Sequence, residues 1–224
     1  MKNTYKFVVA TPKDKEEFEK TPTAISLDKL NLLKNTSVIY NNKVGLSEVY
    51  NSYILDPKNA NSFLIFLHDD ILIEDAFLEE KLTAAFQLYD IVGLAGTKKC
   101  NLSNPTNAWH LMSDPKEFVG EVSHTKDKMF WTNSYGPTPS RALLIDGLFI
   151  GVNVARLLET STNFDNEFSF HHYDIAFCLN ANKNKLKLGV YPIKLVHFGL
   201  GDSMLSKEWQ ESNQHFINKY HINE

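Results

Sequence analysis

Cysteine and arginine are both scarce in this sequence of 224 residues, and each scarcity excludes something. The two cysteines, Cys100 and Cys178, cannot build a disulfide framework, and neither lies in a metal-type cysteine pair, so we expect a reducing, cytoplasmic setting. The arginines are Arg141 and Arg156 alone, so a site for anions in this protein has to use lysine, backbone N–H groups or a metal ion.

Three further absences narrow the function. Lys and Arg total 23 while Asp and Glu total 27, a net charge of −4, so the protein lacks the broad cationic field that holds DNA or RNA. No apolar run approaches the roughly 20 residues that cross a bilayer, and we expect no signal peptide. The glycine patterns GxGxxG and GxxxxGK[ST] are missing, which disfavours dinucleotide oxidoreductases and P-loop enzymes.

Short β-branched runs alternate with helical stretches in the first half of the chain. This order, βαβαβαβ, predicts an α/β fold with an open, mostly parallel sheet covered by helices. The run 62–67 is almost continuously apolar, as expected for a strand buried on both faces of a sheet. The expected strands are 5–10, 36–40, 62–67 and 90–95, with the charged stretch 13–20 and the helices 44–55 and 77–89 between them.

The middle of the chain, residues 96–140, is rich in Asn, Ser, Pro, Gly and Thr but also carries scattered large aromatic side chains. We expect hairpins and ordered loops over one edge of the sheet, a common place for a substrate-specific insertion. Regular elements return afterwards, with strands at 142–145 and 188–196 and helices at 173–181 and 206–220. Without a repeat or a linker, the chain 1–224 is expected to form one domain.

Acidic residues and a histidine directly follow several of the expected strands. Asp69 and Asp70 follow one strand, Asp146 another, and His197 the last. Ligands of open α/β sheets bind beyond the carboxyl ends of the strands, so these side chains converge if the strands are parallel neighbours. Carboxylates and an imidazole meeting there suit a divalent metal, Mg²⁺ or Mn²⁺, which would neutralise a diphosphate.

Each of these residues also has a purely structural explanation. The pair Asp69–Asp70 is typical of a turn or a helix N-cap, and Asp146 with the following glycine is typical of a turn. His197 is equally compatible with a hydrogen-bonded histidine at a strand end. The segment 171–174 lacks metal-ligand spacing and suits the start of a helix, with Asp174 near its positive end.

Several short stretches from the first strand to the last carry a family resemblance through their order and spacing. They are VVAT (8–11), NKVGLSEVYN (42–51), FLHDDI (66–71), DGLF (146–149), HYDI (172–175) and VHFG (196–199). With them the sequence resembles a glycosyltransferase of the GT-A fold, in the inverting family 2 group. The resemblance implies the nucleotide-diphospho-sugar transferase fold, a mixed, mostly parallel sheet flanked by helices, with 96–140 as an insertion near the acceptor side.

The resemblance also assigns the donor site. In the family's Asp-x-Asp motif the first acid is here either replaced by His68 or shifted, and Asp70 would then be the direct metal ligand. His197 resembles the late histidine that completes the metal site, with Mn²⁺ or Mg²⁺ as the ion. On the nucleotide, Asp69 would contact the ribose or a metal-bound water, Thr11 would lie against the base or ribose, and Asn42 is grouped with them.

An inverting transfer needs a base that takes the proton from the acceptor hydroxyl. By resemblance, Asp174 opens a helix over the acceptor site and is the favoured base, while Asp146 lies near the donor sugar and is the alternative. His171 and His172 are reserve candidates, since a histidine titrates near neutral pH. The loops of Trp109 and Trp131 either stack on an acceptor sugar or pack inside the insertion.

The function expected is metal-dependent transfer, with inversion, of a hexosyl or N-acetylhexosaminyl group from a nucleotide sugar to a glycan or lipid-linked acceptor. A UDP-linked donor is expected by family habit. This chemistry suits cytoplasmic polysaccharide biosynthesis, with at most peripheral contact at the inner face of a membrane. Two alternatives remain: a metal-dependent phosphoester hydrolase or nucleotidyltransferase, and an inactive GT-A-like domain that only binds nucleotide sugar.

Overall fold

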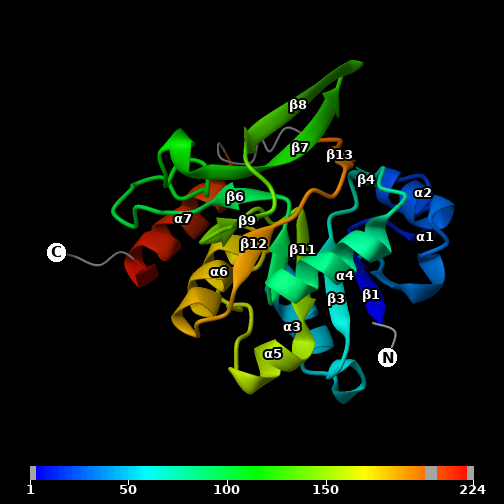
Figure 1. Ribbon diagram of the computed structural model, residues 1–224, viewed down its shortest axis with the longest axis horizontal. Helices are drawn as coiled ribbons and strands as arrows, with labels where there is room; N and C mark the ends of the chain where they lie inside the picture. Colours follow the sequence, from blue (N-terminus) through cyan, green and yellow to red (C-terminus); the bar gives the residue numbers. More distant parts are fainter. Residues whose placement is uncertain (1–3, 200–205, 221–224) are drawn as a thin grey trace.

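The computed structural model describes residues 4–199 and 206–220, which form two sheets with helices packed around the larger one (Figure 1). The larger sheet has seven strands, of which β11 and β9 run against the other five. In spatial order they are β2 (Thr36–Ile39), β1 (Tyr5–Ala10), β3 (Phe63–Leu67), β11 (Phe149–Asn153), β5 (Ile91–Gly93), β12 (Leu188–Val190) and β9 (Ser140–Arg141). The expected mixed, mostly parallel sheet flanked by helices is confirmed.

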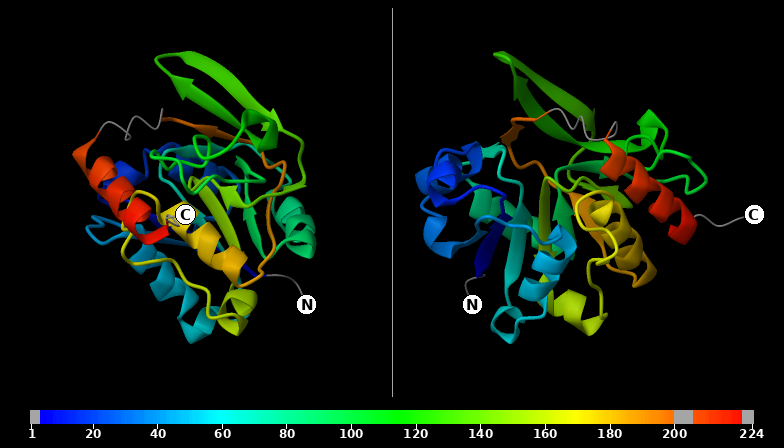
Figure 2. Two further views of the ribbon diagram at one scale, coloured as in Figure 1. Left: turned by 90° about the vertical axis from the view of Figure 1, so that its left-hand side faces the viewer. Right: turned by 180° about the vertical axis from the view of Figure 1, so that it is seen from behind.

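The central strand β3 is buried on both faces, as its unbroken apolar sequence predicted: Leu64, Ile65 and Phe66 are completely inaccessible to solvent. Helix α4 (Leu78–Leu88) covers one face of the sheet, while α3 (Leu46–Ile54) and α6 (Tyr173–Lys183) cover the other (Figures 1 and 2). The remaining helices are α1 (Lys15–Phe18), α2 (Pro22–Lys29), α5 (Val154–Glu159) and α7 (Lys207–Tyr220), and short 3₁₀ turns lie at Leu33–Asn35, Pro57–Asn59 and Pro115–Glu117.

The smaller sheet lies over one end of the larger one, because β4 and β6 continue the chain directly after β3 and β5 (Figure 1). Its order is β10 (Leu144–Ile145), β6 (Ala95–Thr97), β7 (Phe118–Lys126), β13 (Leu195–His197) and β4 (Ile71–Ile73), with β8 (Met129–Gly136) pairing on β7. The β7–β8 hairpin projects from the body and is the main element of the insertion expected over 96–140.

Two predicted strands are wrong in one respect, because each is divided between the two sheets. The run 90–95 separates into β5 and β6, and the run 188–196 separates into β12 and β13. In the second case Pro192 lies at the break, where a residue without an N–H group cannot continue a sheet ladder. The short strand β4 was not predicted. Both breaks carry the chain from the larger sheet toward the smaller one, and the candidate site lies at that junction.

Candidate active site

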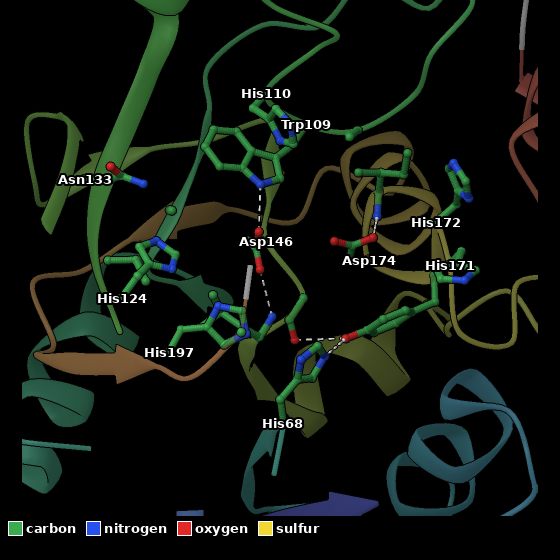
Figure 3. Close-up of a pocket in the computed structure, with 18 of the residues that line it drawn as sticks. His68, Trp109, His110, His124, Asn133, Asp146, His171, His172, Asp174 and His197 are labelled. Atoms are coloured by element: carbon green, nitrogen blue, oxygen red, sulfur yellow. Dashed lines mark hydrogen bonds between the residues drawn. The ribbon is translucent and has the colours of Figure 1, made fainter. Parts of the chain in front are cut away.

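A cavity of about 540 Å³ opens where the smaller sheet meets the beginning of α6. All three tryptophans of the sequence and six of its eight histidines line it. The histidines are His68, His110, His124, His171, His172 and His197. Figure 3 shows Asp146 near the middle of this cavity, with Asp174 on one side and His124 and His197 on the other.

Asp70 and His197 form a close pair in the cavity. Asp70 lies in the turn between β3 and β4, and the antiparallel pairing of β4 with β13 brings His197 beside it, with 3.2 Å between Asp70 Oδ2 and His197 Nε2. Burial opposes ionisation of both groups, but their mutual hydrogen bond and charges outweigh it: the pKa of Asp70 is lowered and the pKa of His197 is raised. The other oxygen, Asp70 Oδ1, is buried and has no hydrogen-bond partner among the described residues.

His68 is positioned by a chain of hydrogen bonds that begins on α6. The Tyr173 hydroxyl donates its proton to the Gly147 carbonyl at 2.9 Å. The Nε2 of His68 lies 3.0 Å from the same hydroxyl oxygen, and it has to be the donor because that hydroxyl has no second proton. This leaves the unprotonated Nδ1 of His68 on the side of Asp70, 4.0 Å from Oδ1. Burial lowers the pKa of His68, which keeps the ring neutral. Gly147 allows the approach, since a Cβ there would collide with the Tyr173 hydroxyl.

Both carboxylate oxygens of Asp146 are already engaged within the protein. Oδ2 accepts a hydrogen bond from the Trp109 indole N–H at 2.8 Å, and Oδ1 accepts one from the Leu148 backbone N–H at 3.0 Å. Trp109 itself is buried, so its loop packs inside the insertion as one of the two expectations had it. Asp146 therefore stabilises the expected turn and also holds the loop that carries Trp109.

Asp174 lies in the first turn of α6 and accepts a hydrogen bond from the Ile175 N–H at 2.9 Å. Burial, followed by the negative charge of Asp146, raises the pKa of Asp174 to about 7. A carboxylate with such a pKa takes up and releases a proton near neutral pH, which is what a general base needs.

The other residues assigned to the nucleotide do not line this cavity; they meet at the end of β1. Thr11 Oγ1 donates to Asp69 Oδ2 at 2.5 Å, and the backbone N–H of Asn42 donates to the Thr11 carbonyl at 2.8 Å. Lys13 also reaches Asp69 Oδ2, at 2.6 Å. Three residues far apart in the sequence thus lie together. Lys13, which the sequence did not single out, supplies a positive charge beside them.

The model of the Glycosyltransferase like family matches residues 17–220. This chain belongs to that glycosyltransferase-like family. The match, with the mixed α/β architecture, confirms the predicted GT-A-type glycosyltransferase fold.

Among solved structures, the glycosyltransferase-like chain is similar to A197 from STIV, with a TM-score of 0.56 and 12% identity over 88% of this chain and 86% of that one. It is also similar to TarS from S. aureus, with a TM-score of 0.48 and 12% identity over 96% of this chain and 42% of that one. No curated protein sequence matches it.

The reserve histidines of this glycosyltransferase-like protein are placed differently from each other. His172 is buried against Trp209, and its Nδ1 lies 2.8 Å from the Ser212 hydroxyl of α7. Burial, with a smaller contribution from the charge of His171, lowers the pKa of His172 to about 4. A neutral, packed ring of this kind holds α7 against α6. His171 is less buried and lines the cavity.

Four of the predicted site residues therefore share one cavity: Asp70, Asp146, Asp174 and His197. The premise behind their convergence was wrong, because β13 and β10 are not neighbours of β3: both belong to the smaller sheet, where β13 lies between β4 and β7 and β10 pairs with β6. Sequence reasoning missed His124 and Tyr173. His124 lies opposite His197 in the register of β7 and β13, within a segment that has no periodic signal.

No three His, Cys, Asp or Glu side chains within residues 4–199 and 206–220 are arranged to hold a metal ion together. In the same part of the chain, no helix is both long and apolar enough to span a membrane.

Proposed function

We propose that this protein transfers a hexosyl or N-acetylhexosaminyl group from a UDP-linked sugar to a glycan or lipid-linked acceptor, with inversion at the anomeric carbon. The observation that supports this reaction most is the pairing, in one cavity, of a carboxyl whose pKa is raised to about 7 with a separate aspartate–histidine pair. Family membership supports sugar transfer in general. Base and cation site are the two requirements of an inverting transfer.

Asp174 is the base in this proposal. Its raised pKa makes it basic enough to take the acceptor proton, whereas the oxygens of Asp146 are held by Trp109 and Leu148. Asp146 instead helps Asp174, because its negative charge is one cause of the raised pKa. The acceptor oxygen would attack the anomeric carbon from the side of α6.

Asp70 and His197 would hold Mn²⁺ or Mg²⁺. The unpartnered Asp70 Oδ1 supports this assignment, because a buried carboxylate oxygen without a donor is suited to a cation. Gly199 leaves room there: a Cβ on it would lie 3.1 Å from both Asp70 Oδ2 and His197 Nε2. With two protein ligands, the ion would need oxygen ligands from the substrate or from water. The ion, when bound, stabilises the charge of the departing nucleoside diphosphate.

Thr11, Asn42 and Asp69 would contact the nucleoside from the end of β1. Lys13, which forms an ion pair with Asp69, would supply a positive charge beside the nucleotide. Lysine is the expected residue for this purpose, because the sequence has only two arginines. The proposal places the reaction in the cytoplasm, in polysaccharide biosynthesis, with lipid-linked acceptors met at the inner face of the membrane.

The test is calorimetric binding of UDP, GDP and CMP, each with and without Mn²⁺. The wild type is compared with Asp70→Ala and with Asp28→Ala, a control on the exposed side of α2. We expect one nucleotide, UDP, to bind only with Mn²⁺, and this binding to be lost in Asp70→Ala but kept in Asp28→Ala.

Other outcomes would revise the proposal in defined ways. Unchanged affinity in Asp70→Ala would remove this residue from the cation site. If no nucleotide binds, the donor site is contradicted, and the alternative of a metal-dependent hydrolase becomes the better explanation. Tight nucleotide binding without consumption of UDP-sugars, in the presence or absence of acceptors, would identify a binding domain that has lost turnover.

A further inference from the structure

The two faces of the β7–β8 hairpin differ in chemistry. Because side chains alternate along a strand, the register Val122↔Asn133 and His124↔Trp131 places these pairs on one face. This face, called the inner face below, turns toward the cavity, which it lines with Val122, His124, Trp131, Asn133 and Tyr135. The outer face carries the pairs Glu121↔Ser134, Ser123↔Thr132 and Thr125↔Phe130, so it is polar except for Phe130 at the tip.

The inner face is a row of aromatic and amide groups. Trp131 is stacked on His124, with ring centroids 5.4 Å apart and planes 15° from parallel. Asn133 donates to the Tyr135 hydroxyl at 3.2 Å, and its Oδ1 accepts no hydrogen bond from the described residues. Tyr135 in turn packs edge-on against Trp109, at 5.1 Å between centroids. The row therefore ends at the indole that bonds Asp146.

Much of the hairpin adds nothing to the hydrophobic core, so stability alone does not explain its length. β13 pairs with β7 only at Ser123 and His124, so beyond His124 the two strands pair only with each other among the described residues. Figure 1 shows this part standing clear of the body. At its end, Met129 and Phe130 are each 63% exposed.

We propose that the inner face of the hairpin is an extended subsite for a glycan chain, so that the acceptor is an oligosaccharide of several units. This inference rests on the proposed function. An indole face offers an apolar, polarisable surface to the C–H face of a pyranose, and an amide can both donate to and accept from sugar hydroxyls. Trp131 and Asn133 present these two groups side by side along one strand.

Length and direction fit a chain better than a single sugar. From Met129 to Tyr135 the strand spans six residue steps, about 20 Å at roughly 3.3 Å per residue, enough for several sugar rings in succession. The inner end of the row is continuous with the cavity that holds Asp174. The sugar that receives the transferred group would lie there, and the rest of the chain would run outward past Asn133 and Trp131.

A lipid bilayer is the other occupant that the exposed tip would suit, since Met129 and Phe130 stand beside Lys128. A bilayer contact at the tip gives no role to the amide of Asn133, which lies deeper, on the cavity wall. The row of Trp131, Asn133 and Tyr135 therefore favours the glycan.

The experiment measures binding to a glycan array, followed by calorimetry with the bound glycan truncated stepwise from its full length to a monosaccharide. The variants are Trp131→Ala and Asn133→Ala on the inner face, with Ser134→Ala on the outer face as the matched control. We expect affinity to rise with chain length in the wild type. Trp131→Ala should weaken binding of the longest chain by about tenfold, as for loss of one central aromatic contact, without affecting the monosaccharide. Ser134→Ala should match the wild type.

Binding of UDP with Mn²⁺ on the same samples separates this inference from the proposed function. A protein that binds UDP but no glycan, or whose affinity is independent of chain length, would overturn the extended subsite and leave the donor site standing. Equal losses in Ser134→Ala and Trp131→Ala would also overturn it. A protein without glycan affinity that binds phosphatidylglycerol vesicles would overturn the inference as well. In that case vesicle binding should be lost in Phe130→Ser and kept in Trp131→Ala. Glycan binding without UDP binding would instead contradict the proposed function.

Discussion

Asp146 and Asp174 are neighbours in one cavity, and their surroundings give them different tasks. Asp146 accepts a hydrogen bond on each carboxylate oxygen, so both of its oxygens are engaged within the protein. Asp174 is buried near this carboxylate, and burial and repulsion together raise its pKa to about 7. A carboxyl that titrates near neutrality, as Asp174 does, is suited to general acid–base catalysis.

The first prediction concerns the base. Asp174→Asn should keep the binding of UDP and Mn²⁺ and lose transfer by about 10²- to 10⁴-fold in kcat, because an amide cannot accept the proton. Steady-state kinetics and calorimetry on the same preparation measure both effects. If Asp146→Asn loses transfer with donor binding intact while Asp174→Asn remains active, the assignment of the base is wrong.

The second prediction concerns pH. Only the ionised form of Asp174 can act as base, so kcat/KM should rise with pH, by about tenfold per unit below the pKa. It should level off above about 7, the pKa to which burial raises this carboxyl. A pH profile of the wild type measures this. A plateau that extends down to about pH 5, near the ordinary range of a carboxyl, would show that another group controls the reaction.

Elements could be predicted from the sequence wherever a local pattern determines them. The apolar run of β3, the amphipathic spacing of α4 and the closing helix α7 all form where they were expected. The division of 188–196 depends instead on which sheet each half reaches, and that is a property of the folded chain. Pro192 was the available local signal for the break.

The same distinction applies to the candidate site. Residues at or near the ends of buried strands, such as Asp70 and His197, could be found because the strand ends are visible in the sequence. Tyr173 and His124 could not, because their roles depend on pairing with distant elements: a hydrogen bond from α6 to His68, and the register of β7 with β13. The segment 96–140 lacks the periodicity from which such pairing is inferred.

The third prediction belongs to the loop between β6 and β7, which Trp109 ties to the body. Trp109→Phe removes the indole N–H and leaves Asp146 Oδ2 without its donor, which should cost about 1–3 kcal/mol of unfolding free energy. Urea denaturation measures the loss, and limited proteolysis should show faster cleavage in this loop.

A double-mutant cycle provides the control for this loop. In Trp109→Phe with Asp146→Ala, the second change should cost less than it does alone, because the shared bond is already gone. Strictly additive losses would mean that the hydrogen bond does not hold the loop.

At the scale of the whole molecule, the two sheets carry different parts of the proposed site. The larger sheet brings Thr11, Asn42 and Asp69 together at the end of β1, and the smaller sheet carries the hairpin. Asp70 lies in the turn that connects β3 to β4, and His197 is the last residue of β13 in the smaller sheet. A cation bound there would join the turn after β3 to the end of β13, which are far apart in the sequence.

The fourth prediction follows from this junction. A ligand that binds only the folded state adds stability that depends on its concentration, about 2.7 kcal/mol at one hundred times the Kd. For a chain of this size each kcal/mol of added unfolding free energy raises Tm by roughly 2–4 °C. UDP together with Mn²⁺ should therefore raise Tm by about 5–10 °C. Either one alone should do much less, because the proposed cation would have two protein ligands and would rely on the diphosphate for others. Asp70→Ala should abolish the shift and EDTA should reverse it, while Asp28→Ala should retain it. A full shift with UDP alone would show that the nucleotide is held without a cation.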